Sequence, residues 1–289
     1  MADNSRAINR IFTRKVICDL IQNGKNDVFD YVVRRYVNEP EGKSHGELVS
    51  EIYAHLGKQQ RNEYYYMNTL LNKLLVGIHN VNTATALSQV HIGHSIADFV
   101  MINGEGQVYE IKSSLDNFDR LHDQLHDYFC AFSKVSVLAS IHELEKVTNI
   151  LGTFGEMGDA VGIYVLSDQD TIFSRERGRK PIEYTELLDH VSIFKLLRKV
   201  EYEKILLHHF GELPQSAPVF YFADCLECFK GIPILEAQRL THLELKKRNK
   251  ITIEEFDSVQ LELKSVVYFS NLIRKLPELN KLLHENYGR

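Results

Sequence analysis

Two carboxylates and a lysine, spaced so that they can meet on one face of a sheet, are the residues of this chain best suited to chemistry. Asp98 lies in an apolar, β-branched stretch, residues 95–102, and Glu110 and Lys112 lie in a second such stretch. Residues two apart on a strand project from the same face, so Glu110 and Lys112 share a face. The turn signal at residues 103–106 predicts that the two stretches form a β-hairpin.

The register of this hairpin decides whether Asp98 joins the other two side chains. Pairing Asp98 with Glu110 places Ile102 opposite Gly106 and leaves a three-residue loop at 103–105. A two-residue turn would instead direct Asp98 to the opposite face of the sheet. We therefore predict the longer loop, or a bulge.

Carboxylates that converge on one sheet face are costly to bury without a counter-charge. A divalent cation removes this cost, because Asp98 and Glu110 supply hard oxygen ligands and the backbone carbonyl of Ile111 can add a third. Lys112 then offers an ammonium, or an amine with a shifted pKa, to position or activate a water molecule. This equipment is typical of metal-assisted hydrolysis of a phosphodiester, with Mg²⁺ or Mn²⁺ as the cofactor.

The pattern D-(x)n-E-x-K across a hairpin resembles the core of the PD-(D/E)XK nuclease superfamily. The next helix carries Gln124-Leu-His-Asp-Tyr128, which resembles the Q-x-x-x-Y element of the RecB-like branch. Residues 62–137 are similar to a bacterial "sce" family of PD-(D/E)XK-like proteins. Asp98 follows Ala97, so the leading residue of the motif name is absent, a departure that is common in the superfamily.

The resemblance implies roles for further residues. Glu63 matches a position from which the helix before the hairpin often contributes an acidic residue to the catalytic site, although the helix dipole alone would also favour it. Gln124 is expected to bond near the scissile phosphate or to order Lys112. Tyr128 is expected to support Gln124 at the substrate, with core packing as the alternative. Arg120 lies one helical turn before Gln124 and is a candidate phosphate contact.

The resemblance also implies an α/β fold of the restriction-endonuclease-like type, a mixed sheet flanked by helices with helical extensions at both ends. The residue patterns after the hairpin predict helix, strand, helix and strand in turn, which fits such a sheet. We expect three consecutive regions: a helical segment at residues 1–60, the nuclease-like core at 61–168 and a mostly helical region at 169–289.

Composition sets wider bounds. The 289 residues carry a formal net charge of −5, which argues against nucleic-acid binding through bulk charge but leaves room for a local basic groove. The arginine-rich stretch 174–180 is a candidate phosphate-contacting loop. No apolar run approaches a membrane span, so no membrane partner is expected. Four scattered cysteines indicate a reducing cytoplasm.

These observations predict a metal-dependent nuclease of bacterial or phage origin, with DNA favoured over RNA and genome defence among the open roles. The alternative is a non-catalytic module that keeps the nuclease fold and binds nucleic acid or protein. A third interpretation makes Glu110 and Lys112 an ordinary exposed salt bridge. A homodimer and an operon-encoded partner both stay open, as do strandedness, sequence specificity and the endo- or exonucleolytic mode.

Overall fold

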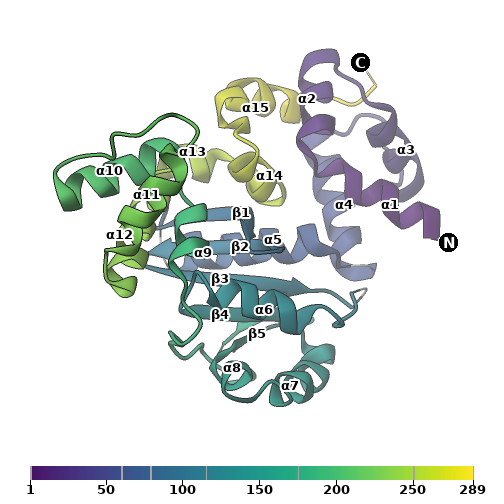
Figure 1. Cartoon of the computed structure of the whole chain (residues 1–289). Coiled ribbons are helices and arrows are strands. Elements are labelled where there is room, and N and C mark those ends of the chain that lie inside the picture. Colours follow the sequence, from purple (N-terminus) through teal and green to yellow (C-terminus); the bar gives the residue numbers. More distant parts are fainter. Residues whose placement is uncertain are drawn as a thin grey trace. The chain divides into compact units, whose positions relative to one another are not determined.

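The chain forms two compact units, residues 1–82 with 251–289 and residues 83–250, which are described separately here. The computed structural model describes residues 2–59, 61–78, 80–114, 116–174, 176–249 and 251–288 (Figure 1). The units do not follow the three consecutive regions expected from the sequence. The last helices return to pack on the first ones, and residues 169–250 belong with the sheet.

One mixed sheet organises the described part of the second unit. The strands are, in spatial order, β1 (Thr85–Ile92), β2 (Ser95–Asn103), β3 (Glu105–Lys112), β4 (Lys134–Ser140), β5 (Gly162–Leu166) and β6 (Ile172–Phe173). Strand β3 is parallel to β4 and β4 to β5, whereas the other neighbours are antiparallel. The expected α/β class with a mixed sheet flanked by helices is confirmed, but strands β1 and β6 were not predicted.

The register of the β2–β3 hairpin agrees with the sequence-based prediction. Ile102 pairs with Gly106, and Asn103 pairs with Glu105 across the loop. Gly104 at the tip has φ of +77°, in the left-handed region where a glycine is favoured. The longer loop therefore places Asp98 and Glu110 on the same face of the sheet.

Helix α6 (Leu121–Phe129) packs on β2 and β4 and covers this face (Figure 1). Its buried Leu125 and Phe129 join Val100, Val108 and Val137 in the core, where each fully buried side chain of this kind stabilises by roughly 1.5–3 kcal/mol. The remaining helices of this unit are η2 (Ile141–Glu143), α7 (Leu144–Gly152), α8 (Gly155–Ala160), α9 (His190–Lys195), α10 (Lys199–Phe210), α11 (Tyr221–Lys230) and α12 (Ile234–Lys246).

The described part of the first unit is helical. Asn68 ties its two sequence segments together, because its side-chain amide bonds to the backbone carbonyl of Leu261 and the backbone N–H of Ser265, at 3.0 and 2.9 Å. Among the described residues, no helix has the length and apolar character needed to cross a membrane. The helices are α1 (Ala2–Ile11), α2 (Arg14–Asn23), α3 (Asp27–Tyr36), α4 (His45–Gln59), α5 (Glu63–Asn72), η1 (Lys73–Ile78), α13 (Ile253–Ser258), η3 (Leu261–Leu263), α14 (Lys264–Phe269), η4 (Leu272–Lys275) and α15 (Leu276–His284).

Candidate functional site

Asp98 and Glu110 lie where β2 and β3 stop pairing. The first residue pair of the hairpin ladder is Phe99 with Tyr109. Four residues of β2 precede this pair and three residues of β3 follow it without pairing to each other. Continued by one step, the register sets Asp98 opposite Glu110. There the side chain of Asp98 replaces a ladder bond, because its Oδ2 accepts a hydrogen bond of 2.9 Å from the backbone N–H of Ile111.

Glu110 is held by groups from two elements. Its side chain is nearly inaccessible, with 2% of the residue exposed. Oε1 accepts a 2.6 Å hydrogen bond from Nε2 of Gln124 and lies 3.0 Å from Nζ of Lys112. Oε2 lies 2.7 Å from the hydroxyl of Tyr128. A buried carboxylate needs such partners, since an unpaired charge in the interior is strongly destabilising.

Lys112 is also buried, and Gln124 links it to Glu110. Nζ of Lys112 donates a 2.9 Å hydrogen bond to Oε1 of Gln124, whose amide nitrogen donates to Glu110. An amide both accepts and donates, so one glutamine can orient an ammonium and a carboxylate at the same time. Gln124 therefore contacts both Lys112 and Glu110, and its expected role, ordering Lys112 or bonding near the phosphate, stays a prediction.

Tyr128 follows Gln124 by one helical turn and is completely buried. Its hydroxyl lies 2.9 Å from the backbone oxygen of Ile96 as well as 2.7 Å from Glu110. Burial, followed by the charge of Glu110, raises the pKa of the Tyr128 hydroxyl far above its ordinary range, so the group stays protonated. Tyr128 lies in the core, as one of its two interpretations expected, and its polar end contacts Glu110.

The candidate donors for a divalent cation at the end of the hairpin are two carboxylates and one backbone carbonyl. Among the described residues, no group of three or more histidine, cysteine, aspartate or glutamate side chains could hold a metal ion. Mg²⁺, however, is commonly bound by only one or two carboxylates, with water and substrate phosphate completing the shell. In a strand the N–H and C=O of one residue point to the same neighbour, so the carbonyl of Ile111 faces Asp98 too. Asp98, Glu110 and the carbonyl of Ile111 are therefore the candidate ligands at this end of the hairpin.

Comparison with known families decides where this chain belongs. The family model described as bacteriophage P4 protein cII matches residues 57–261, which is more than half of the chain. The chain belongs to this family. The match includes the whole hairpin, helix α6 and Glu63, and it agrees with the expected bacterial or phage origin. Comparisons with curated proteins and with solved structures found no match.

The other predicted site residues of this cII-family chain are Arg120 and Glu63. Arg120 is exposed at the start of α6, one turn before Gln124. Glu63 is exposed in the first turn of α5, in the other unit, so its expected contribution to the site stays a prediction. Asp116, between β3 and α6, accepts hydrogen bonds from the N–H and hydroxyl of Ser113, at 2.8 and 2.7 Å. It closes the turn after β3.

The arginine-rich stretch does not present all of its charge for phosphate binding. Nε of Arg179 donates a 2.7 Å hydrogen bond to the backbone oxygen of Val161, and the Arg179 backbone pairs with Ile163 of β5. Arg177 lies over the ring of Phe173, 5.8 Å from its centroid. Residue 175 lies outside the described residues. Arg179 therefore has a structural role. The sequence does not show it, because an arginine that binds a backbone carbonyl and an arginine that faces solvent have the same residue type.

Sequence reasoning also missed Asp127 on α6. Its Oδ2 accepts hydrogen bonds from the backbone N–H of His94 and the hydroxyl of Ser95, at 2.9 and 2.7 Å. The partners lie more than thirty positions apart in the chain, so no local pattern signals the contact. The position of Asp127 directly before Tyr128 was the one available hint.

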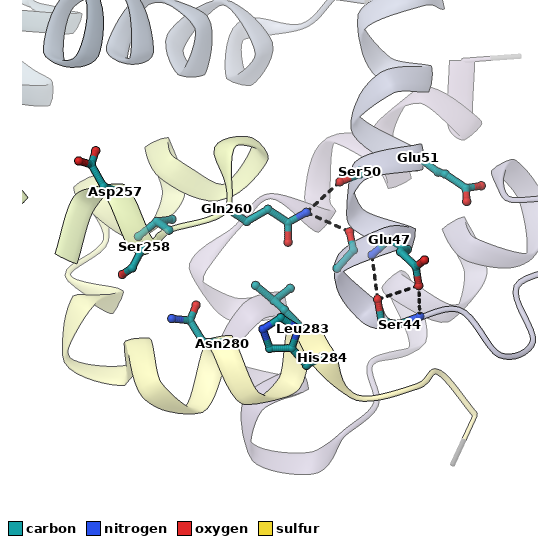
Figure 2. A pocket seen from close by; sticks show the side chains of 12 residues that line it. Ser44, Glu47, Ser50, Glu51, Asp257, Ser258, Gln260, Asn280, Leu283 and His284 are labelled. Atoms are coloured by element: carbon teal, nitrogen blue, oxygen red, sulfur yellow. Dashed lines mark hydrogen bonds between the residues drawn. The ribbon is translucent and has the colours of Figure 1, made fainter. Parts of the chain in front are cut away.

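A cavity of about 700 Å³ lies elsewhere, in the first unit of the cII-family chain, and no predicted site residue lines it (Figure 2). Its walls come from the start of α4, from the end of α13 with the residues after it, and from α15. Glu47 accepts hydrogen bonds from the N–H and hydroxyl of Ser44, at 2.7 and 2.9 Å, and these bonds lower the pKa of its carboxyl. Glu51 pairs with Lys43 at 2.7 Å.

Proposed function

We propose that this chain is a metal-dependent nuclease of the PD-(D/E)XK type that hydrolyses phosphodiester bonds in DNA, with Mg²⁺ or Mn²⁺ as its cofactor. One observation carries the proposal. Asp98 and Glu110 face each other where the strands part, and Lys112 lies 3.0 Å from Glu110 in a hydrogen-bonded group with Gln124. The same residue types at the same positions of a hairpin and helix carry the resemblance to the nuclease superfamily.

Asp98, Glu110 and the carbonyl of Ile111 would hold the ion. A bound divalent cation supplies positive charge against the developing negative charge of the phosphate and makes a nearby water molecule more acidic. Tyr128 and Gln124 keep the carboxylate of Glu110 in one orientation. Side chains locked in this way lose no further freedom when substrate binds.

Lys112 directs one donor toward the substrate. An ammonium has three N–H donors, and its described contacts use two of them, with Glu110 and Gln124. The third can orient the attacking water or neutralise charge on the phosphate. Arg120, exposed at the start of α6, is suited to bind a neighbouring phosphate and to set the register of the strand.

A non-catalytic module is the second candidate, and one observation favours it. Glu110, Lys112, Gln124 and Tyr128 satisfy one another, and the carboxylate and ammonium neutralise each other. A purely structural polar cluster would have the same features. Such a module has no need to bind Mg²⁺, so a metal titration separates the two candidates.

A cleavage panel tests the proposal. Supercoiled plasmid, linear duplex, single-stranded DNA and RNA are each incubated with Mg²⁺, Mn²⁺ or EDTA. We expect metal-dependent cutting of DNA that falls by about 10²–10³ in Lys112→Ala, the range found when one transition-state donor is removed. Lys230→Ala is the matched control, because Lys230 is an exposed lysine of the same unit that pairs with Glu227.

Cleavage that persists in EDTA, or wild-type rates for Lys112→Ala, would contradict the proposed mechanism. No cleavage together with no binding of either ion would favour the non-catalytic module. Cleavage of RNA but not DNA would support the proposed metal-dependent hydrolysis and would show that the substrate is RNA.

A further inference from the structure

Two consecutive residues of α6 hold the first residues of β2. Asp127 accepts hydrogen bonds from the N–H of His94 and the hydroxyl of Ser95, at 2.9 and 2.7 Å. The hydroxyl of Tyr128 reaches the carbonyl oxygen of Ile96, at 2.9 Å. Three successive positions of the chain are thus bound to one turn of one helix.

The contact between Asp127 and the β1–β2 turn is close. Gly93 in this turn has φ of +59°, and a Cβ atom at this position would lie 2.5 Å from Oδ1 of Asp127. The positive φ favours glycine at this position, and any Cβ there would force the Asp127 carboxylate to move. The backbone of the turn therefore lies directly against the carboxylate.

This contact lies where the sheet gives β2 the least support. Pairing of β2 with β3 starts only at Phe99, so the segment before it is held by β1 on one side, by α6 across the face and by the single side-chain bond from Asp98 to Ile111. Asp98 lies in that segment. The same helix holds Glu110 on β3, through Gln124 and Tyr128. One rigid element thus fixes both strands at the point where they separate.

From this arrangement we infer that Asp127 is a positioning residue, which sets the separation between Asp98 and Glu110 and so tunes the affinity and choice of the metal ion. The inference rests on the proposed function. Mg²⁺ demands near-ideal octahedral geometry at 2.0–2.1 Å from its ligands, whereas larger ions accept more distorted shells. A loosened start of β2 therefore weakens binding of Mg²⁺ more than binding of Mn²⁺.

Calorimetric titration of the full-length protein with Mg²⁺ alone and with Mn²⁺ alone tests the inference. Removal of an outer-shell partner commonly costs 10–100-fold in metal affinity. Asp127 bonds to none of the proposed ligands directly, so we expect Asp127→Ala to weaken Mg²⁺ binding by up to about tenfold, the low end of this range, and Mn²⁺ binding clearly less. Asp123→Ala is the matched control, since the Asp123 side chain lies one turn earlier on α6 and is 86% exposed. It should bind both ions as the wild type does.

Hydrogen exchange supplies a second readout that does not depend on the metal. The amide of His94 should exchange faster in Asp127→Ala than in the wild type or in Asp123→Ala, because it loses its acceptor. If Asp127→Ala fails to fold, Ser95→Ala removes only the 2.7 Å bond and should shift the Mg²⁺ to Mn²⁺ affinity ratio in the same direction by a smaller factor.

The outcomes separate the inference from the proposed function. A wild-type protein that binds neither ion overturns the proposed function and the inference with it. A wild type that binds both ions, with an unchanged affinity ratio in Asp127→Ala or in Ser95→Ala, overturns the inference alone.

Discussion

The hairpin site of the second unit and the cavity of the first unit differ in how their charged side chains are buried, and this difference indicates a functional site better than cavity volume does. The cavity is about 700 Å³, yet two carboxylates in its wall are engaged locally, Glu47 at a helix start and Glu51 with Lys43. The hairpin site instead combines a carboxylate that is 2% exposed with a lysine that is 7% exposed. Burying charged groups costs desolvation free energy. Charged groups buried close together are therefore a better indication of a functional site here than the volume of a cavity is.

The origin of the side chains differs as well. In the cavity, Glu47 and Glu51 have partners three and eight residues away in the sequence, at a helix cap and in a surface pair. At the hairpin, the partners come from β2, β3 and α6, so only the tertiary fold can assemble them. A site built from distant segments needs a reason beyond local structure, and the metal-assisted chemistry proposed above would supply one here.

The largest expected difference between the two regions concerns Glu110 and Glu51. Glu110→Ala leaves Lys112 buried without its carboxylate, and breaking a buried pair in this way costs about 3–5 kcal/mol of unfolding free energy. Glu51→Ala removes a surface pair whose side chains are 41% and 28% exposed, which is worth at most about 1 kcal/mol. Denaturant unfolding of both variants measures the difference, and equal losses would break the comparison.

Protonation gives the next largest effect, at His242 of α12. Its ring stacks on Phe132, and its Nε2 lies 2.5 Å from the place that a Cβ on Gly106 would take. Within the described part of the chain that nitrogen has no hydrogen-bond partner. Burial lowers the pKa of His242 to about 4. The unfolded chain, with an ordinary histidine pKa near 6.5, then binds more protons than the folded one below that pH.

Stability should therefore fall as the pH drops from about 6.5 to about 4, by up to about 3 kcal/mol from this group. His242→Phe should lose this part of the pH dependence, because it keeps the stacking and removes the proton site. His284→Phe, in the exposed wall of the cavity, is the control and should retain it. Unfolding free energies at pH 7 and pH 4.5 for the three proteins test the assignment, and identical pH dependence in all three would refute it.

The features predicted from sequence are those that local rules determine. The hairpin register followed from the alternation of faces and the length of the loop, and Ile102 indeed pairs with Gly106. The approach of Gln124 and Tyr128 to one side of a helix followed from their spacing of four. In both cases the interaction that decides the structure lies within about twenty residues.

The features that were missed depend on contacts between distant segments. Strand β1 and the return of the C-terminal helices to the first unit are set by packing across the chain, which no window of sequence contains. Arg179 was expected to face solvent, yet its guanidinium binds the carbonyl of Val161. Asp127 bonds to the turn more than thirty residues before it. The sequence shows that Arg179 and Asp127 are polar, but it does not show which groups they bind in the folded chain.

The smallest difference separates two tyrosine hydroxyls, one in each unit. Tyr128→Phe removes the group shared by Glu110 and the carbonyl of Ile96, both inside the protein, and should cost about 1–3 kcal/mol because a buried acceptor loses its donor. Tyr287→Phe removes a 3.1 Å bond to Asp30, which water can replace, and should cost less. Tyr128→Phe should also weaken binding of Mg²⁺, since Glu110 then gains rotational freedom, whereas Tyr287→Phe should leave it unchanged. Unfolding and calorimetric titration of the same two variants measure both effects, and a loss of stability in Tyr128→Phe without any loss of metal affinity would show that its hydroxyl supports the fold alone.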